Sequence, residues 1–209
     1  MEALCTVTDL EKQLGGVPVL GPLSLSLYAG EIVGLIGANG TGKTTFLKLL
    51  AGVDRPTKGA ICYAFPAVRV GYVPQDVALY ESMTARQNLL FFADLAGLRG
   101  RARHARVDVL LDALHLKERA WQRVAHYSGG MKRRLNLAAA ITVLPHVLLL
   151  DEPTVGADAD SIAWMLALLQ SLKAEGCCIV LVSHHDAEIK QTCDRIFRLE
   201  NGSLHRCDA

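Results

Sequence analysis

The chain lacks features typical of membrane-spanning, secreted and nucleic-acid-binding proteins. No apolar run approaches the length of a membrane helix, and the best candidate, residues 138–150, contains Pro145 and His146. The N-terminus carries Glu2 and no basic segment followed by a long apolar run, so no secretory signal is expected. Because 22 Lys and Arg residues face 21 Asp and Glu residues, the formal net charge is +1, and no nucleic acid partner is expected.

Cysteine motifs are missing as well. The six cysteines are scattered and none forms a C-x-x-C pair, so neither a metal site nor a redox motif is predicted. Reduced thiols of a cytosolic protein are the simplest interpretation. The 209 residues, 51% of them hydrophobic, suffice for one domain with a full core and a small subdomain. Because no apolar run has the length of a membrane helix, a transport role would need another chain to provide the path across the membrane.

Apolar runs and turn residues predict an α/β fold on a mostly parallel sheet with antiparallel edges. Residues 147–150 and 179–182 are uniformly apolar, as strands buried on both faces should be. Residues 1–27 alternate short apolar runs with glycine turns and predict β-structure, and residues 200–203 predict a hairpin turn.

Helices are predicted between these strands. A capping box at Thr84 and Gln87 opens a helical region that extends to about residue 116. Further helices are expected over residues 128–144 and 161–174. Together these ranges predict a single domain over residues 1–209, with a helical subdomain inserted at approximately residues 78–135.

Residues 37–44 match the phosphate-binding pattern G-x-x-x-x-G-K-[ST]. An apolar strand candidate precedes the loop and a helix candidate follows it, so successive backbone N–H groups and the helix dipole would face one anion. Lys43 supplies positive charge to the β- and γ-phosphates, and the Thr44 hydroxyl can ligate Mg²⁺. The predicted nucleotide-binding residues of this segment are Gly37, Asn39, Gly40, Gly42, Lys43, Thr44 and Thr45. With the mostly parallel sheet, this motif predicts the fold of a P-loop NTPase core.

Two acidic residues end the apolar strand at residues 147–150. A parallel sheet presents its ligands beyond the carboxyl ends of its strands, so Asp151 is expected near the Mg²⁺ of the phosphate loop, through water. Glu152 could polarise a water molecule for in-line attack on the γ-phosphate.

With these motifs in place, the chain resembles the ATP-binding cassette (ABC) family of transporter ATPases. Tyr127-Ser128-Gly129-Gly130-Met131 is similar to the signature loop of that family, whose usual form is L-S-G-G-Q. The resemblance covers residues 10–202 and is closest to the branch that powers exporters of drugs, antibiotics and polysaccharides. Ser128, Gly129 and Gly130 also open a helix, so their N–H groups and the serine hydroxyl form an anion site. In the family, this loop completes the ATP site of a second subunit.

The resemblance implies further site residues. Gln75 corresponds to the Q-loop glutamine, which reaches Mg²⁺ and the attacking water. Asp158 lies in the D-loop, and His184 is the switch histidine that donates to the γ-phosphate. The neighbouring His185 is the alternative, and Ser183-His184 fits the family better. The catalytic residues expected are Glu152, His184, Lys43 and Gln75, and the metal ligands expected are Thr44, Gln75 and Asp151.

The sequence departs from the family at the base-binding position. Leu14 stands where the family usually has an aromatic residue that stacks on adenine, and leucine lacks the π face. Nucleotide binding is therefore expected to be weaker or less selective for the base. Tyr127 and Met131 are milder departures within the signature loop.

The function implied is an ATPase subunit that dimerises around ATP, most simply as a homodimer. It would drive a separate membrane subunit at the cytoplasmic face of the membrane, with export favoured over import. One alternative is a soluble ATPase switch of the same family; a two-cassette translation factor is expected to be longer, and no coiled coil of the repair type is present. Another is a P-loop kinase for a small molecule, which would have no use for a signature loop.

Overall fold

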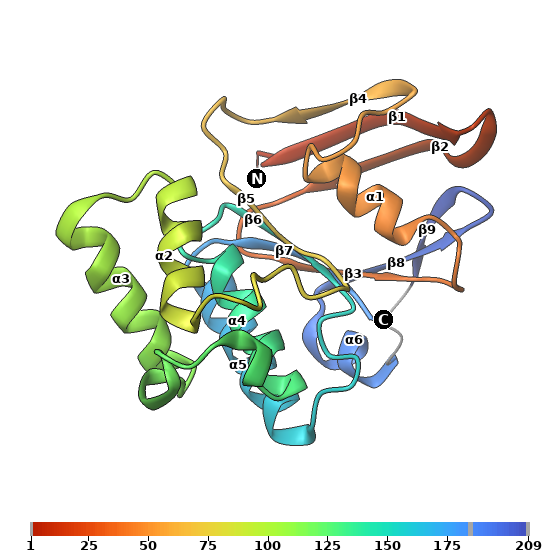
Figure 1. Ribbon diagram of the computed structural model, residues 1–209. Coiled ribbons are helices and arrows are strands. Elements are labelled where there is room, and N and C mark those ends of the chain that lie inside the picture. The colour runs from red at the N-terminus through yellow and green to blue at the C-terminus, as the bar shows by residue number, and fades with distance from the viewer. Residues whose placement is uncertain (1, 184–185, 208–209) are drawn as a thin grey trace.

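The computed structural model describes residues 2–183 and 186–207 of the chain. Its strands form two sheets, one above the other (Figure 1). The strands are β1 Cys5–Leu14, β2 Val17–Leu27, β3 Ile32–Ile36, β4 Lys58–Tyr63, β5 Val70–Val73, β6 Val147–Asp151, β7 Cys178–Val182, β8 Arg195–Glu200 and β9 Ser203–Cys207. The upper sheet is antiparallel, in the order β2-β1-β4, and the lower has the order β5-β6-β7-β3-β8-β9.

The six-stranded sheet is parallel except for its last strand. β5, β6, β7, β3 and β8 pair in parallel, and β9 returns antiparallel to β8. The predicted hairpin is confirmed: Asn201 and Gly202 both adopt positive φ, 49° and 76°, as a two-residue turn between twisted strands requires. The predicted α/β class, with a mostly parallel sheet and antiparallel edges, is therefore confirmed.

Successive side chains of the central strands point to opposite faces of this sheet, so a hydrophobic core forms on each face. In β6, Val147 and Leu149 pack toward α1 and the upper sheet, whereas Leu148 and Leu150 pack toward the helices on the other face. All five residues of β6 and of β7 are buried. Strands covered on both faces explain the uniformly apolar runs in the sequence.

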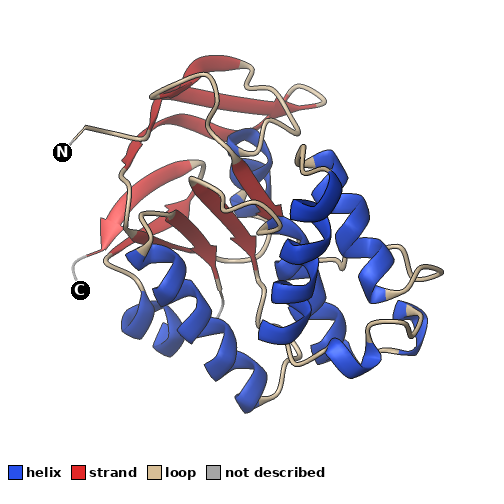
Figure 2. Ribbon diagram, turned by 90° about the vertical axis from the view of Figure 1, so that its left-hand side faces the viewer, coloured by secondary structure: helices blue, strands red, loops and turns tan. Residues whose placement is uncertain are grey.

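The helices are α1 Lys43–Leu50, α2 Ala85–Leu95, α3 Gly100–Ala113, α4 Gly129–Ala140, α5 Ala159–Ala174 and α6 Asp186–Thr192, with short 3₁₀ turns at Lys117–Arg119 and Val124–His126. α1 lies between the two sheets, and most other helices lie below the parallel sheet (Figures 1 and 2). α2 packs on α3 and α4, beyond the β5 edge. Among the described residues, no helix combines the length and apolar character needed to cross a bilayer.

The capping box predicted at α2 is confirmed. The Thr84 hydroxyl accepts from the Gln87 N–H at 3.1 Å, and the Gln87 side-chain oxygen accepts from the Thr84 N–H at 2.9 Å. This reciprocal pair satisfies two N–H groups that the helix itself leaves unpaired.

The helix predicted over residues 128–144 ends earlier than expected, at Ala140. The next three residues, Ile141, Thr142 and Val143, are β-branched and favour helices poorly. Arg106, on α3, donates to the carbonyls of Ile141 and Thr142 at 2.8 and 2.9 Å, which satisfies acceptors at the end of the helix. Two further elements, β4 and α6, had no clear signal in the sequence.

Candidate functional site

The phosphate loop connects the end of β3 to the start of α1, as its pattern predicts. Two of its glycines allow an approach that a side chain would block. A Cβ on Gly37, whose φ is 155°, would lie 2.5 Å from the Leu199 carbonyl oxygen. A Cβ on Gly42, whose φ is 101°, would lie 2.7 Å from a methyl group of Leu20. The loop therefore packs closely against β2 and β8. This packing holds the N–H groups of the loop at the N-terminus of α1.

Lys43 folds back over its own loop. Its Nζ donates to the carbonyl oxygens of Gly37 and Ala38 at 2.8 and 2.9 Å. Burial lowers the pKa of Lys43, and the nearby carboxylates of Glu152 and Asp151 oppose that shift. The ammonium group is thus held at the mouth of the loop beside two acids.

A cavity of about 500 Å³ opens in front of the phosphate loop. It is lined by Leu14, Val19, Asn39, Gly40, Gly42, Lys43, Thr44, Thr45, Gln75 and Glu152. Residues from the upper sheet, the loop, the segment after β5 and the end of β6 therefore meet at one site. Leu14 is 51% exposed at its rim, where the resemblance predicts the base to bind.

Glu152 and Gln75 contact each other in this cavity. The Gln75 Nε2 donates to the Glu152 Oε2 at 3.0 Å. The N–H of Glu152 donates to the Val182 carbonyl at 3.0 Å, and its φ is 51°, in the left-handed region. A residue with a side chain adopts that conformation only when its surroundings fix it, and such strain is concentrated at functional sites.

Asp151 is 1% exposed, and neither of its carboxylate oxygens has a hydrogen-bond partner of ordinary geometry among the described residues. Burial raises the pKa of Asp151; the neighbouring Thr44 hydroxyl lowers it and Glu152 raises it further. An unpaired carboxylate buried beside a threonine hydroxyl is a donor set that fits a hard divalent cation with bound water. The predicted Mg²⁺ ligands are thus compatible with such an ion.

The signature loop lies outside this cavity. The Ser128 hydroxyl accepts from the Met131 N–H at 3.3 Å and caps α4. Asp158 caps α5 through the Ser161 N–H at 2.8 Å. A Cβ on Gly130 would lie 3.2 Å from the Ser161 hydroxyl, so the signature loop and Asp158 are neighbours. None of these residues lines the phosphate-loop cavity of the same chain.

One predicted site residue remains to be placed, and two residues at the site were not predicted from the sequence. His184 and its alternative His185 lie outside the described residues. Val19 lines the cavity from β2, and no sequence pattern marks it. Tyr72, on β5, has a buried hydroxyl without a partner among the described residues, and burial, with the nearby Asp151, raises its pKa to about 12.

Comparison with known proteins gives the family. The profile of the ABC transporter family matches residues 20–155. "Nod factor export ATP-binding protein I" of Burkholderia lata (strain ATCC 17760 / DSM 23089 / LMG 22485 / NCIMB 9086 / R18194 / 383) is 41% identical, over 93% of this chain and 67% of that protein. "Linearmycin resistance ATP-binding protein LnrL" of Bacillus subtilis (strain 168) is 34% identical, over 94% of this chain and 66% of the length of that protein.

A solved structure described as "Structure of ATP binding subunit of ABC transporter" superimposes with a TM-score of 0.90 at 30% identity. The match covers 98% of this chain and 89% of the other. Fold, sequence and cavity agree, and the chain belongs to the ABC transporter family as an ATP-binding subunit with ATPase activity.

Proposed function

We propose that this chain is the ATPase subunit of a membrane exporter, and that two copies close around ATP to drive a separate membrane subunit. The observation that carries the proposal is the contact between Gln75 and Glu152 in the cavity of the phosphate loop. This hydrogen bond links Glu152, which would activate the water, to Gln75 in the segment that leads from β5 toward α2. The export function in the names of the relatives supports the direction of transport.

In the proposed reaction, the phosphate-loop N–H groups and Lys43 bind the β- and γ-phosphates. Lys43 exchanges its carbonyl partners for phosphate oxygens, because a cation binds an anion more strongly than a neutral dipole. Glu152 accepts a proton from the attacking water, and the Gln75 amide orients that water. We assign His184 as a further donor to the γ-phosphate from its place in the motif order.

Mg²⁺ would be held by Thr44, by Asp151 through water, and by Gln75. When bound, it neutralises charge that develops on the phosphate oxygens. The unpaired carboxylate of Asp151 is the observation that supports this assignment.

The site is proposed to be complete only in a dimer. Ser128, Gly129, Gly130 and Asp158 lie together outside the cavity of their own chain. The N–H groups of Gly129 and Gly130 stand at the start of α4, where a helix binds anions, and Asp158 caps the neighbouring α5. We assign them to the nucleotide held by the second copy, and no nucleic acid takes part.

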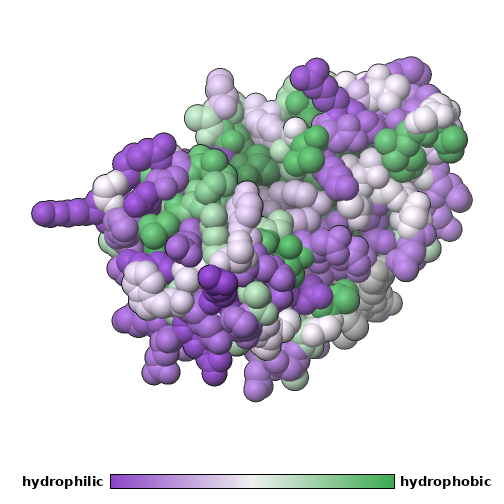
Figure 3. Space-filling view, viewed as in Figure 1, coloured by the Kyte–Doolittle hydropathy of each residue, from purple (hydrophilic) through white to green (hydrophobic). Residues whose placement is uncertain are grey.

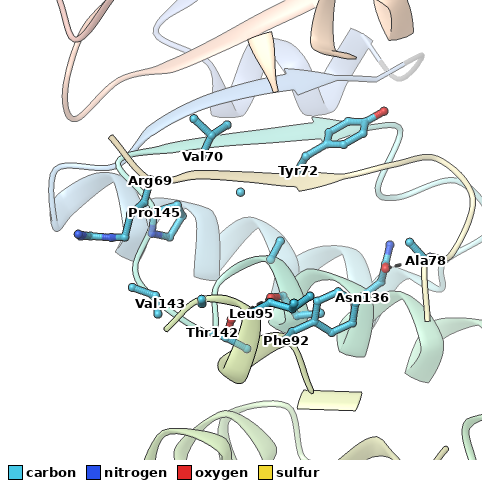
Figure 4. A pocket seen from close by; sticks show the side chains of 14 residues that line it. Arg69, Val70, Tyr72, Ala78, Phe92, Leu95, Asn136, Thr142, Val143 and Pro145 are labelled. Carbon is cyan, nitrogen blue, oxygen red and sulfur yellow. Dashed lines mark hydrogen bonds between the residues drawn. The ribbon is translucent and has the colours of Figure 1, made fainter. Parts of the chain in front are cut away.

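A groove beyond the β5 edge is the proposed contact with the membrane subunit. It has a volume of about 400 Å³ and lies between β5, α2 and α4 (Figure 4). Phe92 and Leu95 line it, and Leu95 is 70% exposed. Figure 3 shows hydrophobic side chains gathered between the α2–α3 side of the molecule and the upper sheet.

The groove is connected to the ATP site through one short segment. The Asn136 amide oxygen, on α4, accepts from the Ala78 N–H at 3.1 Å, three residues after Gln75 (Figure 4). Movement of α2 and α4 would therefore reach Gln75 through this segment. We propose that residues 78–135 act as the helical subdomain that transmits it, with the chain bound to the cytoplasmic face of the membrane.

Replacement of Leu95 by arginine tests the membrane partner. A tagged wild-type chain, expressed in the organism that encodes it, should purify from detergent-solubilised membranes together with a multi-helix membrane protein. A buried arginine in the groove should lower the recovered amount at least ~10-fold, because charge is costly in an apolar contact. ATP hydrolysis by the isolated subunit should be unchanged. Val109→Arg, at an exposed aliphatic residue of α3 outside that groove, is the matched control. Recovery of no membrane protein by the wild type would favour the soluble switch.

Replacement of Leu14 by tyrosine tests the base site. An aromatic ring at the rim of the cavity should stack on the base and tighten ATP binding by roughly 2- to 10-fold. Equilibrium binding of ATP and GTP to both proteins measures the effect. Val53→Tyr places the same ring at an exposed aliphatic residue beyond the C-terminal end of α1, outside the cavity lining, and should change neither affinity. Unchanged ATP and GTP affinities in Leu14→Tyr would contradict the assignment.

A further inference from the structure

A half-buried carboxylate joins the ends of the two central strands. The hydroxyls of Thr154 and Ser183 both donate to the Oε2 of Glu188, at 2.9 and 3.0 Å. Thr154 is 2% exposed and Ser183 is 3% exposed. Thr154 follows β6, Ser183 follows β7, and Glu188 lies on α6, so one oxygen atom connects three elements.

This cluster surrounds the backbone that carries Glu152. Thr154 comes two residues after Glu152, and Ser183 directly follows Val182, whose carbonyl accepts the Glu152 N–H. Glu152 is the residue with the left-handed φ of 51°. A backbone in that region needs restraints from outside. Glu188 supplies two of them, because it binds Thr154 in the chain after Glu152 and Ser183 beside the Val182 carbonyl on the neighbouring strand.

We propose that Glu188 is a positioning residue for ATP hydrolysis, which holds Glu152 at the angle that water activation requires. The proposal rests on the proposed role of Glu152 as the base. Glu188 does not line the cavity, so it acts through Thr154 and Ser183 and makes no contact with the nucleotide. An ionised carboxylate is suited to this task, because it only accepts hydrogen bonds and one of its oxygens can take two donors.

The chemistry predicts a loss of turnover without a loss of binding. Removing the acceptor frees Thr154 and lets the Glu152 carboxylate shift relative to the attacking water. Misplacement of a catalytic group by about 1 Å can cost on the order of 100-fold in rate. The phosphate loop connects β3 to α1 and makes no hydrogen bond to Glu188 among the described residues, so the affinity for ATP should stay within about twofold.

The test measures kcat, KM and ATP affinity for Glu188→Ala and Glu188→Gln at matched folded fractions. We expect kcat to fall at least ~10-fold in Glu188→Ala and less in Glu188→Gln, whose amide oxygen still accepts. Thr154→Val removes only one hydroxyl and keeps the shape; it should also lower kcat, and it serves if Glu188→Ala fails to fold. The control is Glu31→Gln, at a carboxylate that accepts from the Tyr28 N–H and from Arg195, before β3 and away from the phosphate loop. It should lower stability and leave kcat unchanged.

A double variant decides whether Glu188 acts through Glu152. In a Glu152→Gln background, Glu188→Gln should cause no further loss of turnover, since coupled residues are not additive. Wild-type kcat in Glu188→Ala, or an equal loss in both backgrounds, would overturn the proposal. Substantial hydrolysis by Glu152→Gln alone would instead reject the base assigned under the proposed function, so the two failures are distinguishable.

Discussion

Replacement of Glu152 by glutamine is expected to lower steady-state ATP hydrolysis by roughly two to four orders of magnitude while ATP binding persists. The amide keeps the size of the side chain and its contact distance to Gln75, but it cannot accept the proton of the attacking water. General-base catalysis contributes roughly 10²- to 10⁴-fold, so turnover should fall by about that factor. The measurement is phosphate release beside equilibrium ATP binding by the same preparation.

The same variant should accumulate as an ATP-bound dimer, because hydrolysis is the step proposed to open the pair. Size-exclusion chromatography with and without ATP and Mg²⁺ measures this. Glu31→Gln is the control, since it also replaces a part-buried carboxylate but at a distance from the cavity. Phosphate release by Glu152→Gln near the wild-type rate would rule out Glu152 as the base.

Replacement of Ser128 by arginine should eliminate hydrolysis for a different reason. Ser128 opens α4 outside the cavity of its own chain, so a long side chain there leaves the phosphate loop untouched. In the proposed dimer, the arginine would occupy the space of the partner's γ-phosphate and inactivate the one ATP site that this signature loop completes. We expect activity to fall at least ~100-fold, as when a preorganised donor at a reacting anion is lost. ATP binding by the isolated subunit should remain.

Loss of the helix cap must be separated from loss of the site. Thr84→Arg removes the equivalent cap of α2, at a cost of about 1 kcal/mol, without touching the signature loop. It should show a similar fall in melting temperature and retain activity. If Ser128→Arg hydrolyses ATP normally, the signature loop has no part in the reaction.

Local interactions explain why much of the fold could be predicted from the sequence. The capping box of Thr84 and Gln87, the turn at Asn201 and Gly202, and the phosphate loop each depend on residues close in the chain. The strands β6 and β7 could be predicted from their uniformly apolar runs, because both faces of each strand are covered. The sequence alone predicts the family, the fold class and the ATPase activity, and the comparisons confirm all three.

Long-range contacts explain what could not be predicted. The end of α4 at Ala140 depends partly on Arg106, which comes from α3 and binds the carbonyls that follow the helix. Glu188 and Thr154 are 34 residues apart, and no spacing rule connects them. The roles of the predicted site residues stay predictions, although most of them surround one cavity.

The central claim is that each ATP site is built from two copies of the chain. Mixing Glu152→Gln with Ser128→Arg subunits, before ATP is added, tests it directly. In a mixed dimer, one site carries both defects, and the other combines an intact Glu152 with an intact signature loop. Random pairing should restore up to about a quarter of the wild-type rate of phosphate release, although each variant alone is inactive. A mixture no more active than its separate components would contradict the account.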